Sequence, residues 1–267
     1  MMTEPFMQLE DEGILWIKPW MSNNSNIVAG FTTREGGISH PPYQSNNLGF
    51  HVEDNPSDVL QNRQRVAEMI SFSLDKWVMA DQIHGNHVQF IQSKDSGSGA
   101  FSREDAIPET DGLITTEKNV LCTALFADCV PLFFADRKQG TVAISHAGWK
   151  GTVSNIAKKT IDHFKQLSSD VKDIEVVIGP SICGSCYQVN DHVIQHIDAK
   201  YVDSYQGADD QYQLDLKDLN YRLLVDAGVS PDHIHISKYC TSHHSSFFSH
   251  RRDQHPTGRM MGFIAFV

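Results

Sequence analysis

The chain has 267 residues, of which 40% are hydrophobic and 21% charged, a balance that is ordinary for a globular protein and allows a sizeable core. Its formal net charge of −11 argues against general nucleic-acid binding, because that binding needs a basic face. No apolar run is long enough for a membrane span, and Met1–Glu12 lacks a secretory signal. Five cysteines fit reduced thiols better than a disulfide framework, so we expect a cytoplasmic protein.

In the first half of the chain, short apolar runs bounded by turn residues predict strands. These runs are residues 14–20, 27–33, 77–80, 87–91, 112–116 and 120–127. Between the first two runs, Ser22–Asn26 has the composition of a turn. Asn55 as N-cap and Pro56 at the first position predict a helix that continues to about Ser71. The stretch 93–109 is rich in Ser, Gly and Asp and predicts a mobile surface loop.

The second half continues with predicted strands at 132–135, 142–145, 174–178, 234–237 and 262–267. A helix is expected to start at Gly151-Thr152 and to keep one apolar face through Leu167. Residues 193–201 predict a short helix, and Asp215–Ala227 predicts a longer one. Strands and helices mix without strict βαβ alternation, and no linker or repeat divides the chain. We therefore expect one α+β domain over residues 1–267, with helices outside mixed sheets.

Three potential metal ligands stand beside predicted strands. Cys129 comes before the strand 132–135, His146 follows the strand 142–145, and His84 lies in a loop, 45 residues before Cys129. Two imidazoles and a thiolate are ligands that zinc prefers, and three protein ligands leave a fourth position open, as in catalytic sites. Two other interpretations remain. Cys129 and His146 could form a metal-free nucleophile–base pair, or the three residues could be ordinary buried side chains.

Other polar residues give less specific indications of a metal or redox site. Cys183 and Cys186 have the spacing of a zinc half-site or a redox pair, but no second C-x-x-C accompanies them, and reduced loop thiols are the simpler interpretation. A metal site is also conceivable among the clustered histidines His243, His244, His250 and His255. The paired H-x-H segments expected of a multicopper oxidase are nevertheless absent.

Several short blocks follow one another over nearly the whole chain, and each of them is weak alone. They are F-T-T-R-E-G-G-I-S at 31–39, N-L-G-F-H-V at 47–52, Q-I-H-G at 82–85, T-D-G-L-I-T at 110–115, A-D-C-V-P-L at 127–132, H-A-G-W-K-G-T at 146–152, G-P-S-I-C at 179–183, C-Y-Q-V at 186–189, and C-T, F-F-S-H-R-R-D and T-G-R-M between 240 and 260. In combination they resemble the laccase-domain purine nucleoside phosphorylases, formerly described as multicopper polyphenol oxidase-like proteins. Ser185 and His250 depart from the Cys and Tyr that are frequent in that family.

The resemblance implies that His84, Cys129 and His146 bind zinc, with copper as a less favoured possibility. It also implies phosphorolysis of adenosine, inosine and S-methyl-5′-thioadenosine, with deamination of adenosine as a further activity. The implied fold stacks mixed sheets between helices in four α/β/β/α layers. The expected partners are purine nucleosides and inorganic phosphate, and the expected state is a monomer or a homodimer, without a nucleic acid or membrane partner.

For deamination, water activated by the metal attacks C6 of adenine, and a carboxylate that is not a ligand carries a proton to the leaving ammonia. Asp111 and Asp128 are the candidates for that carboxylate. The alternatives of other classes are a metal-independent cysteine hydrolase or deamidase, a copper polyphenol oxidase, and a metal-binding protein without turnover.

For phosphorolysis, cations must hold the phosphate and stabilise the charge on the departing purine. Planar guanidinium groups match phosphate oxygens, and the candidates are Arg34, Arg251, Arg252 and Arg259. Arg34 and Arg251 are also candidates for a catalytic role. Phe248 or Trp149 could stack on the purine.

Overall fold

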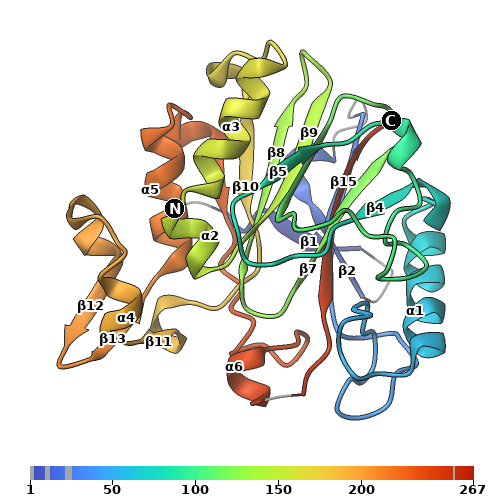
Figure 1. Cartoon of the computed structure of the whole chain (residues 1–267), viewed down its shortest axis with the longest axis horizontal. Helices are drawn as coiled ribbons and strands as arrows, with labels where there is room; N and C mark the ends of the chain where they lie inside the picture. Colours follow the sequence, from blue (N-terminus) through green and yellow to red (C-terminus); the bar gives the residue numbers. More distant parts are fainter. Residues whose placement is uncertain (1–2, 10–12, 22–25, 255) are drawn as a thin grey trace.

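The computed structural model describes residues 3–9, 13–21, 26–254 and 256–267, and within these residues the strands form two six-stranded sheets and one three-stranded sheet (Figure 1). The first sheet has the strand order β1 (Phe6–Gln8), β2 (Ile14–Ile17), β3 (Ile27–Thr32), β15 (Met260–Phe266), β7 (Leu121–Phe126) and β4 (Trp77–Met79). The second has the order β14 (Ile234–Ile236), β10 (Glu175–Ile178), β8 (Val130–Asp136), β9 (Thr141–Ala147), β6 (Gly112–Thr115) and β5 (Val88–Phe90). Both sheets are mixed, because each combines antiparallel pairs with parallel ones.

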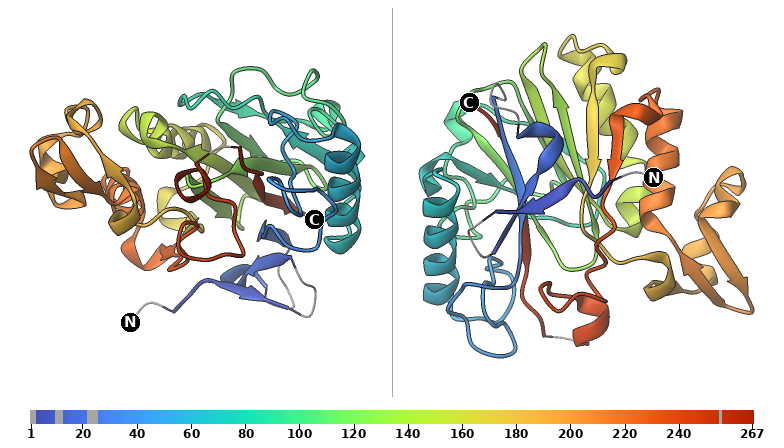
Figure 2. Two further views of the ribbon diagram at one scale, coloured as in Figure 1. Left: turned by 90° about the horizontal axis from the view of Figure 1, so that it is seen from below. Right: turned by 180° about the vertical axis from the view of Figure 1, so that it is seen from behind.

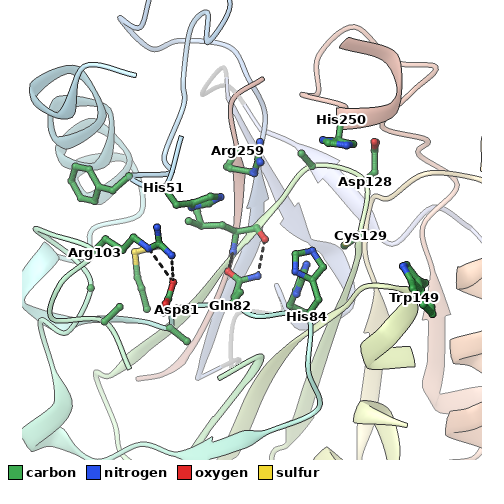
Figure 3. Close-up of a pocket in the computed structure, with 18 of the residues that line it drawn as sticks. His51, Asp81, Gln82, His84, Arg103, Asp128, Cys129, Trp149, His250 and Arg259 are labelled. Carbon is green, nitrogen blue, oxygen red and sulfur yellow. Dashed lines mark hydrogen bonds and ion pairs between the residues drawn. The ribbon is translucent and has the colours of Figure 1, made fainter. Parts of the chain in front are cut away.

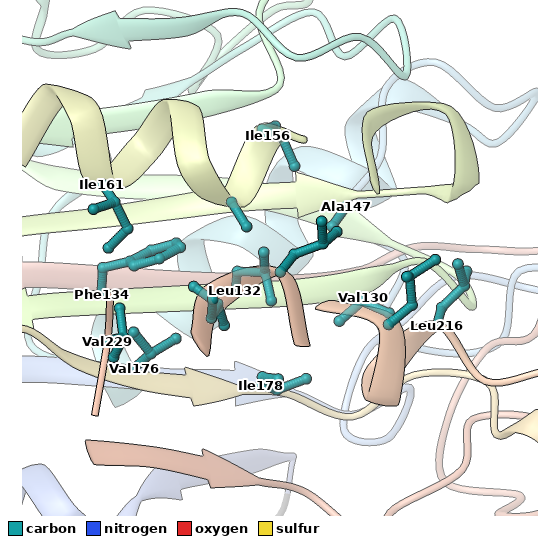
Figure 4. Close-up of a cluster of buried hydrophobic side chains, with 14 of the residues drawn as sticks. Val130, Leu132, Phe134, Ala147, Ile156, Ile161, Val176, Ile178, Leu216 and Val229 are labelled. Carbon is teal, nitrogen blue, oxygen red and sulfur yellow. The ribbon is translucent and has the colours of Figure 1, made fainter. Parts of the chain in front are cut away.

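The two large sheets pack face to face, and their strands are therefore buried on both sides. Successive side chains of a strand point to opposite faces, so Phe133 of β8 lies in the core between the sheets. The next residue, Phe134, packs on the other face against Ile161 and its neighbours (Figure 4). Burial on both faces explains why β8 and β9 are continuous apolar runs without alternation.

Helices cover the outer faces of the two sheets. The outer face of the first sheet packs against α1 (Pro56–Met69) through Val66 and Ala67. The outer face of the second sheet is covered by α2 (Trp149–Val153), α3 (Ile156–Gln166) and α5 (Leu216–Asp226). In Figures 1 and 2, α1 and the pair α3 and α5 lie on opposite sides of the sheets. The α/β/β/α layering predicted for an α+β fold is therefore confirmed.

The third sheet was not predicted from the sequence. It has the order β11 (Gln188–Val189), β13 (Gln211–Leu214) and β12 (Tyr205–Ala208), and it projects to one side of the molecule with the short helix α4 (Asp191–Ile194) (Figure 2). Three of the four residues of β12 are exposed, and its sequence Tyr-Gln-Gly-Ala shows no hydrophobic alternation. The predicted helix 193–201 is wrong in extent, because α4 ends at Ile194 and a 3₁₀ helix follows only at Ala199–Ser204.

Each predicted strand has a counterpart, whereas β1 was missed in addition to the third sheet, and a second helix differs from its prediction. The helix expected from Gly151 begins at Trp149 and is interrupted after Val153. Asn155 takes a left-handed conformation there, with φ of 61°, and its side chain caps the new helix α3 by accepting a bond from the Lys158 amide. The predicted turn Ser22–Asn26 lies, except for Asn26, outside the described residues.

The loop 93–109 is anchored to the rest of the protein by a buried arginine. Arg63 of α1 is only 2% exposed, and its guanidinium donates to the carbonyl oxygens of Leu48, Gly99 and Ala100 at 2.6–2.9 Å. The ring of Phe50 lies 4.1 Å from the same guanidinium. One side chain thus joins α1 to two loops, 47–52 and 93–109.

Replacing Arg63 with methionine should lower the free energy of unfolding by about 3 kcal/mol, because three buried carbonyl groups lose their donors and each such loss costs about 1–3 kcal/mol. Urea unfolding followed by far-UV circular dichroism measures this change. Arg65→Met is the matched control, since Arg65 is exposed on the same helix, and it should stay within about 0.5 kcal/mol of the wild type. Equal effects of the two substitutions would contradict the anchoring role.

Candidate metal centre

The three predicted ligands meet at one edge of the second sheet. Cys129 directly precedes β8, and His146 lies near the end of β9, where it is paired with Pro131. The start of one antiparallel strand adjoins the end of its neighbour, so these two side chains are brought together by the β8–β9 pairing. His84 arrives from the loop between β4 and β5. The donor atoms of the three side chains lie within 4.8 Å of one another.

A single carboxylate, that of Asp111, holds several groups in place at this edge of the sheet. Asp111, which precedes β6 and is 2% exposed, accepts a hydrogen bond from His146 Nδ1 at 2.8 Å. The same carboxylate accepts the backbone amides of His84 at 3.0 Å and of Gly85 at 2.6 Å. An ionised carboxylate only accepts, so Nδ1 of His146 carries a proton and its Nε2 is the atom that could bind a metal ion. In metalloproteins, a carboxylate bonded to the other ring nitrogen orients a histidine ligand in this way.

The charge balance of the site favours a thiolate. Burial by itself raises the pKa of Cys129, but the charge on His146 and hydrogen bonds from His146 and His84 outweigh it and lower the pKa to about 6. Burial by itself lowers the pKa of His146, but Cys129 and Asp111 outweigh it and raise the pKa to about 9. Burial also raises the pKa of Asp111, yet the hydrogen bond from His146 holds it below its ordinary value.

The backbone of the ligand loops is held in unusual conformations. His84 has a φ of 62°, in the left-handed region that few non-glycine residues adopt. The Asp111 carboxylate accepts the amide of Ile83 as well as those of His84 and Gly85, and these three bonds offset the cost of that conformation. The ligand loop is therefore fixed by the same group that orients His146.

A glycine leaves space among the ligands. A Cβ added to Gly148 would lie 3.0 Å from His84 Cδ2 and 3.2 Å from Cys129 Sγ, and 3.8 Å from His146 Cε1. The φ of Gly148 is −68°, which any residue can adopt, so the constraint on this position is space and not backbone conformation. The donor set of one thiolate and two imidazoles, with room kept beside it, fits a borderline metal ion such as zinc.

The ligands line a cavity of about 480 Å³, a size that suits a small organic ligand (Figure 3). One wall carries His51, Arg103 and Arg259, and the other side carries Trp149 and His250. Tyr187 and Arg251 also line it, with the Arg251 guanidinium 5.1 Å from the centre of the Tyr187 ring. The cavity therefore joins a three-ligand centre to cationic and aromatic groups.

The structure brings part of the predicted set to this cavity. Asp128, Trp149, Arg251 and Arg259 line it, as does the ligand triad. Both oxygens of Asp128 are engaged, since Oδ1 accepts the Thr241 hydroxyl at 2.6 Å and Oδ2 accepts the Arg251 amide at 2.7 Å. Asp128 therefore joins two segments of the cavity wall.

Three predicted substrate-binding residues lie outside the lining. Phe248 is fully buried in the core between the sheets and presents no face to a purine, which corrects its predicted stacking role. The Arg34 guanidinium stacks on Phe248 at 4.6 Å and donates to the Gln44 carbonyl, away from the cavity. Arg252 pairs with Asp253 at 2.7 Å and donates to the carbonyl of Phe247. Adjacent residues on a helix face different directions, so only Arg251 of the Arg251-Arg252 pair reaches the cavity.

Sequence reasoning missed several wall residues. His51 and Gln82 lie inside the blocks N-L-G-F-H-V and Q-I-H-G, which offered a signal that was not used for them. Removal from bulk water and the charges of Arg259 and Arg103 hold the pKa of His51 well below its ordinary value, so its ring is neutral. Arg103 comes from the loop 93–109, where nothing in the local pattern indicated a role. Its guanidinium binds Asp81 at 2.9 and 3.0 Å.

Known proteins share this chain's sequence and fold over most of its length. Residues 28–267 match the family described as multi-copper polyphenol oxidoreductase laccase. A Bacillus subtilis protein named purine nucleoside phosphorylase YlmD is 46% identical over 269 residues, which cover 97% of this chain and 96% of that protein. The protein of the same name from Geobacillus stearothermophilus is 40% identical and covers 93% of each chain. The crystal structure of the Bacillus licheniformis hypothetical protein YfiH has a TM-score of 0.95 and 41% identity, over 99% of this chain and 100% of that one.

None of the helices that the structure describes is long and apolar enough to cross a membrane.

Substituting Asp111 with asparagine should weaken metal binding about 10- to 100-fold, because an amide cannot accept the His146 Nδ1 proton and all three loop amides together. Competition for Zn²⁺ with a chromophoric chelator measures the affinity. Asp81→Asn is the control, since Asp81 lines the same cavity but pairs with Arg103. An Asp111→Asn protein that binds as tightly as Asp81→Asn would show that the carboxylate does not orient the ligands.

Proposed function

We propose that this chain, which belongs to the multi-copper polyphenol oxidoreductase laccase family, is a zinc-dependent purine nucleoside phosphorylase. The proposed substrates are adenosine, inosine and S-methyl-5′-thioadenosine, together with inorganic phosphate. The observation that carries the proposal is a three-ligand centre, open on one side, in a cavity of about 480 Å³ that also holds arginines. The names of the Bacillus subtilis and Geobacillus stearothermophilus relatives support the same reaction.

In this proposal His84, Cys129 and His146 hold the metal, and Asp111 is a positioning residue. A zinc ion bound there supplies Lewis acidity at the purine or at the phosphate. The three protein ligands leave a position that faces the cavity, as catalytic zinc sites do. The proposed state is a monomer or a homodimer.

Phosphorolysis requires hydrogen-bond donors on the cavity wall, for the phosphate and for the charge that develops on the purine. A phosphate oxygen forms a bond to C1′ of the ribose while the bond from C1′ to the purine nitrogen breaks. The electron pair of that bond goes to the purine, which then takes up a proton. Donors aimed at the phosphate and at the developing charge lower the barrier, because the cavity is shielded from bulk water.

Arg259 and Arg251 are the proposed phosphate ligands. Nη1 of Arg259 donates to the carbonyls of Thr257 and Gly258 at 2.8 and 3.0 Å, which fixes the guanidinium plane against the cavity. Arg251 is oriented by its stacking on Tyr187 and by a bond to the Cys186 carbonyl at 3.3 Å. Pre-set planar guanidinium groups suit phosphate recognition, because little conformational entropy is lost on binding.

Aromatic walls replace Phe248 in the proposed purine subsite. Trp149 follows the ligand His146 by three residues, lines the cavity and is partly exposed. Tyr187 lines the cavity and is packed under Arg251. Stacking between such rings and a flat purine contributes in the range seen for aromatic pairs, about 0.5–1.5 kcal/mol beyond the buried area.

Deamination of adenosine is a second proposed activity of the same centre. The observation that favours it is the open position on a centre with three protein ligands. The proton would have to pass through a carboxylate, and Asp111 and Asp128 remain the candidates. Both are already hydrogen-bonded, which favours phosphorolysis as the main reaction.

The metal-free alternative also has structural support. Cys129, His146 and Asp111 form a thiol–imidazole–carboxylate row like that of a cysteine hydrolase. That interpretation gives no role to His84, whose ring also hydrogen-bonds the Cys129 thiol. A metal centre explains all three side chains. A copper polyphenol oxidase is less favoured, because only one of the two ligand clusters among the described residues opens on the cavity.

Incubation with adenosine, inosine or S-methyl-5′-thioadenosine should release the free base and form the ribose 1-phosphate product only when phosphate is present. Product masses read by mass spectrometry distinguish this from deamination, which forms inosine and ammonia without phosphate. His84→Ala should lower the rate by at least about 100-fold, since a ligand of the metal is lost. Full activity of metal-free protein would overturn the role of the metal.

Arg259→Met should raise the KM for phosphate at least about 10-fold, because a charge-assisted contact with the anion is lost. The KM for the nucleoside should change less. Arg34→Met is the matched control, since Arg34 lies outside the cavity on Phe248. Initial rates over a range of phosphate concentrations test both variants, and an effect of Arg34→Met equal to that of Arg259→Met would overturn the assignment.

A further inference from the structure

A second set of metal-type ligands lies beside the cavity and shares no residue with the first. It consists of Cys183, Cys186, Cys240 and His243, whose donor atoms all lie within 4.8 Å of one another. The thiol groups of these cysteines are free, and none of the four side chains is used in the proposed reaction. Cys240 is buried, the other two cysteines are half-buried, and His243 is exposed, so an ion can reach the cluster from the surface.

Two chain segments form the cluster. After β10 the chain turns through a 3₁₀ helix, Gly184–Cys186, which brings the two cysteines of the C-x-x-C to the same side. After β14 a second segment carries Cys240 and His243 at C-x-x-H spacing. The segments run side by side, since Ser181 forms a parallel bridge with Cys240 and the Thr241 amide donates to the Ser181 carbonyl at 3.1 Å.

The contacts among the four side chains are those of metal ligands drawn close together. Nε2 of His243 lies 3.0 Å from Cys186 Sγ, and Nδ1 lies 4.0 Å from Cys183 Sγ. The Cys183 amide donates to Cys240 Sγ at 3.3 Å, and a hydrogen bond of this kind stabilises a thiolate. Sulfur ligands of a tetrahedral zinc ion stand about 3.8 Å apart, given zinc–sulfur bonds of about 2.3 Å. The side chains therefore need to shift by no more than about 1 Å to surround an ion.

We propose that Cys183, Cys186, Cys240 and His243 bind a structural zinc ion in a closed Cys₃His shell. Four protein ligands leave no open position, which is typical of structural sites and contrasts with the three-ligand centre in the cavity. The two spacings, C-x-x-C and C-x-x-H, are those of paired zinc half-sites. On binding, the three thiols release their protons and become ligands.

A buried cation balances the charge of this site. Three thiolates and one Zn²⁺ carry a net charge of −1. Lys217 of α5 is buried, and its ammonium donates to the carbonyls of Ser237 and Tyr239, each at 2.9 Å, in the segment that leads to Cys240. Burial lowers the pKa of Lys217, and the neighbouring Asp215, Cys240 and Cys183 oppose that shift only in part. The ammonium lies where it would offset part of the negative charge of a thiolate cluster.

The proposed ion links the segments that build one wall of the cavity. Cys186 is followed by Tyr187, and its carbonyl accepts a bond from Arg251. Cys240 is followed by Thr241, which donates to Asp128 beside the metal ligand Cys129. The ion would therefore hold in place the segments that carry Tyr187 and Thr241, without taking part in the reaction. A disulfide between Cys183 and Cys186 would leave Cys240 and His243 without a role.

The zinc content of purified protein tests the proposal. Protein prepared with Zn²⁺ and then freed of loosely bound ions should hold two zinc ions per chain by elemental analysis. Cys129→Ser should hold one, with three sulfur ligands and one nitrogen ligand by X-ray absorption at the zinc edge. Cys183→Ser combined with Cys186→Ser should also hold one, bound by one sulfur and two nitrogen ligands. A Cys129→Ser protein without zinc would overturn the proposal.

A neighbouring histidine provides the matched control. His243→Ala should lose zinc from the second site at chelator concentrations that leave the wild type loaded, whereas His244→Ala, which is exposed and outside the cluster, should keep both ions. If the two variants lose zinc alike, His243 is not a ligand.

The wild-type protein can also be tested directly, so that the result does not depend on whether a variant folds. Bound Zn²⁺ should protect the half-buried Cys183 and Cys186 from alkylation, as read by mass spectrometry, and a chelator should make both thiols reactive. Equal alkylation with and without Zn²⁺, or a Cys183–Cys186 disulfide in protein purified under reducing conditions, would overturn the site. None of these measurements uses a nucleoside, so their outcome is independent of whether the protein is a phosphorylase.

Discussion

The carboxylate of Asp111 is the group on which the candidate metal centre depends. It joins three parts of the chain that are distant in sequence: the start of β6, the loop that carries His84 and the end of β9 that carries His146. A buried carboxylate is costly unless its lone pairs are used, and here four donors use them. The same four bonds fix the direction of the ligands. One set of hydrogen bonds thus offsets the cost of burying the Asp111 charge and also orients the candidate ligands.

Much of the second sheet could be predicted from the sequence, because its strands are buried on both faces and read as short apolar runs. Cys129 and His146 could be singled out for a related reason, since they flank those runs, whereas their grouping with His84 as metal ligands rested on the family resemblance. Other parts of the cavity wall could not be predicted, because His51 and Arg103 reach it from loops whose positions follow from packing. The strand β12 was also missed, because it is short and mostly exposed and its sequence shows no hydrophobic alternation. The laccase-family resemblance gave the four layers, which local patterns alone left open.

The roles of the arginines show the limit of reading charge from sequence. Arg34, Arg251, Arg252 and Arg259 look alike as residue types, yet the structure gives them different surroundings. Arg34 lies on a buried ring, and Arg252 is bound to Asp253 and to backbone carbonyls. Only Arg251 and Arg259 line the cavity. The Cys183 and Cys186 pair shows the same limit, because its partners Cys240 and His243 are 57 residues further along the chain from the cysteines that they contact.

The β8–β9 hairpin has a consequence for how the protein can change during evolution. Its strands stay in register from Asp136 opposite Thr141, beside the turn, to Val130 opposite Ala147, next to the candidate metal ligands. One residue added within either strand would shift the pairing and turn a ligand to the wrong face of the sheet. Residues added in the turn 137–140 lie at the far end and leave that pairing intact. Insertions and deletions among homologues should therefore accumulate at this turn, which also makes it a suitable place to graft a peptide tag or a reporter.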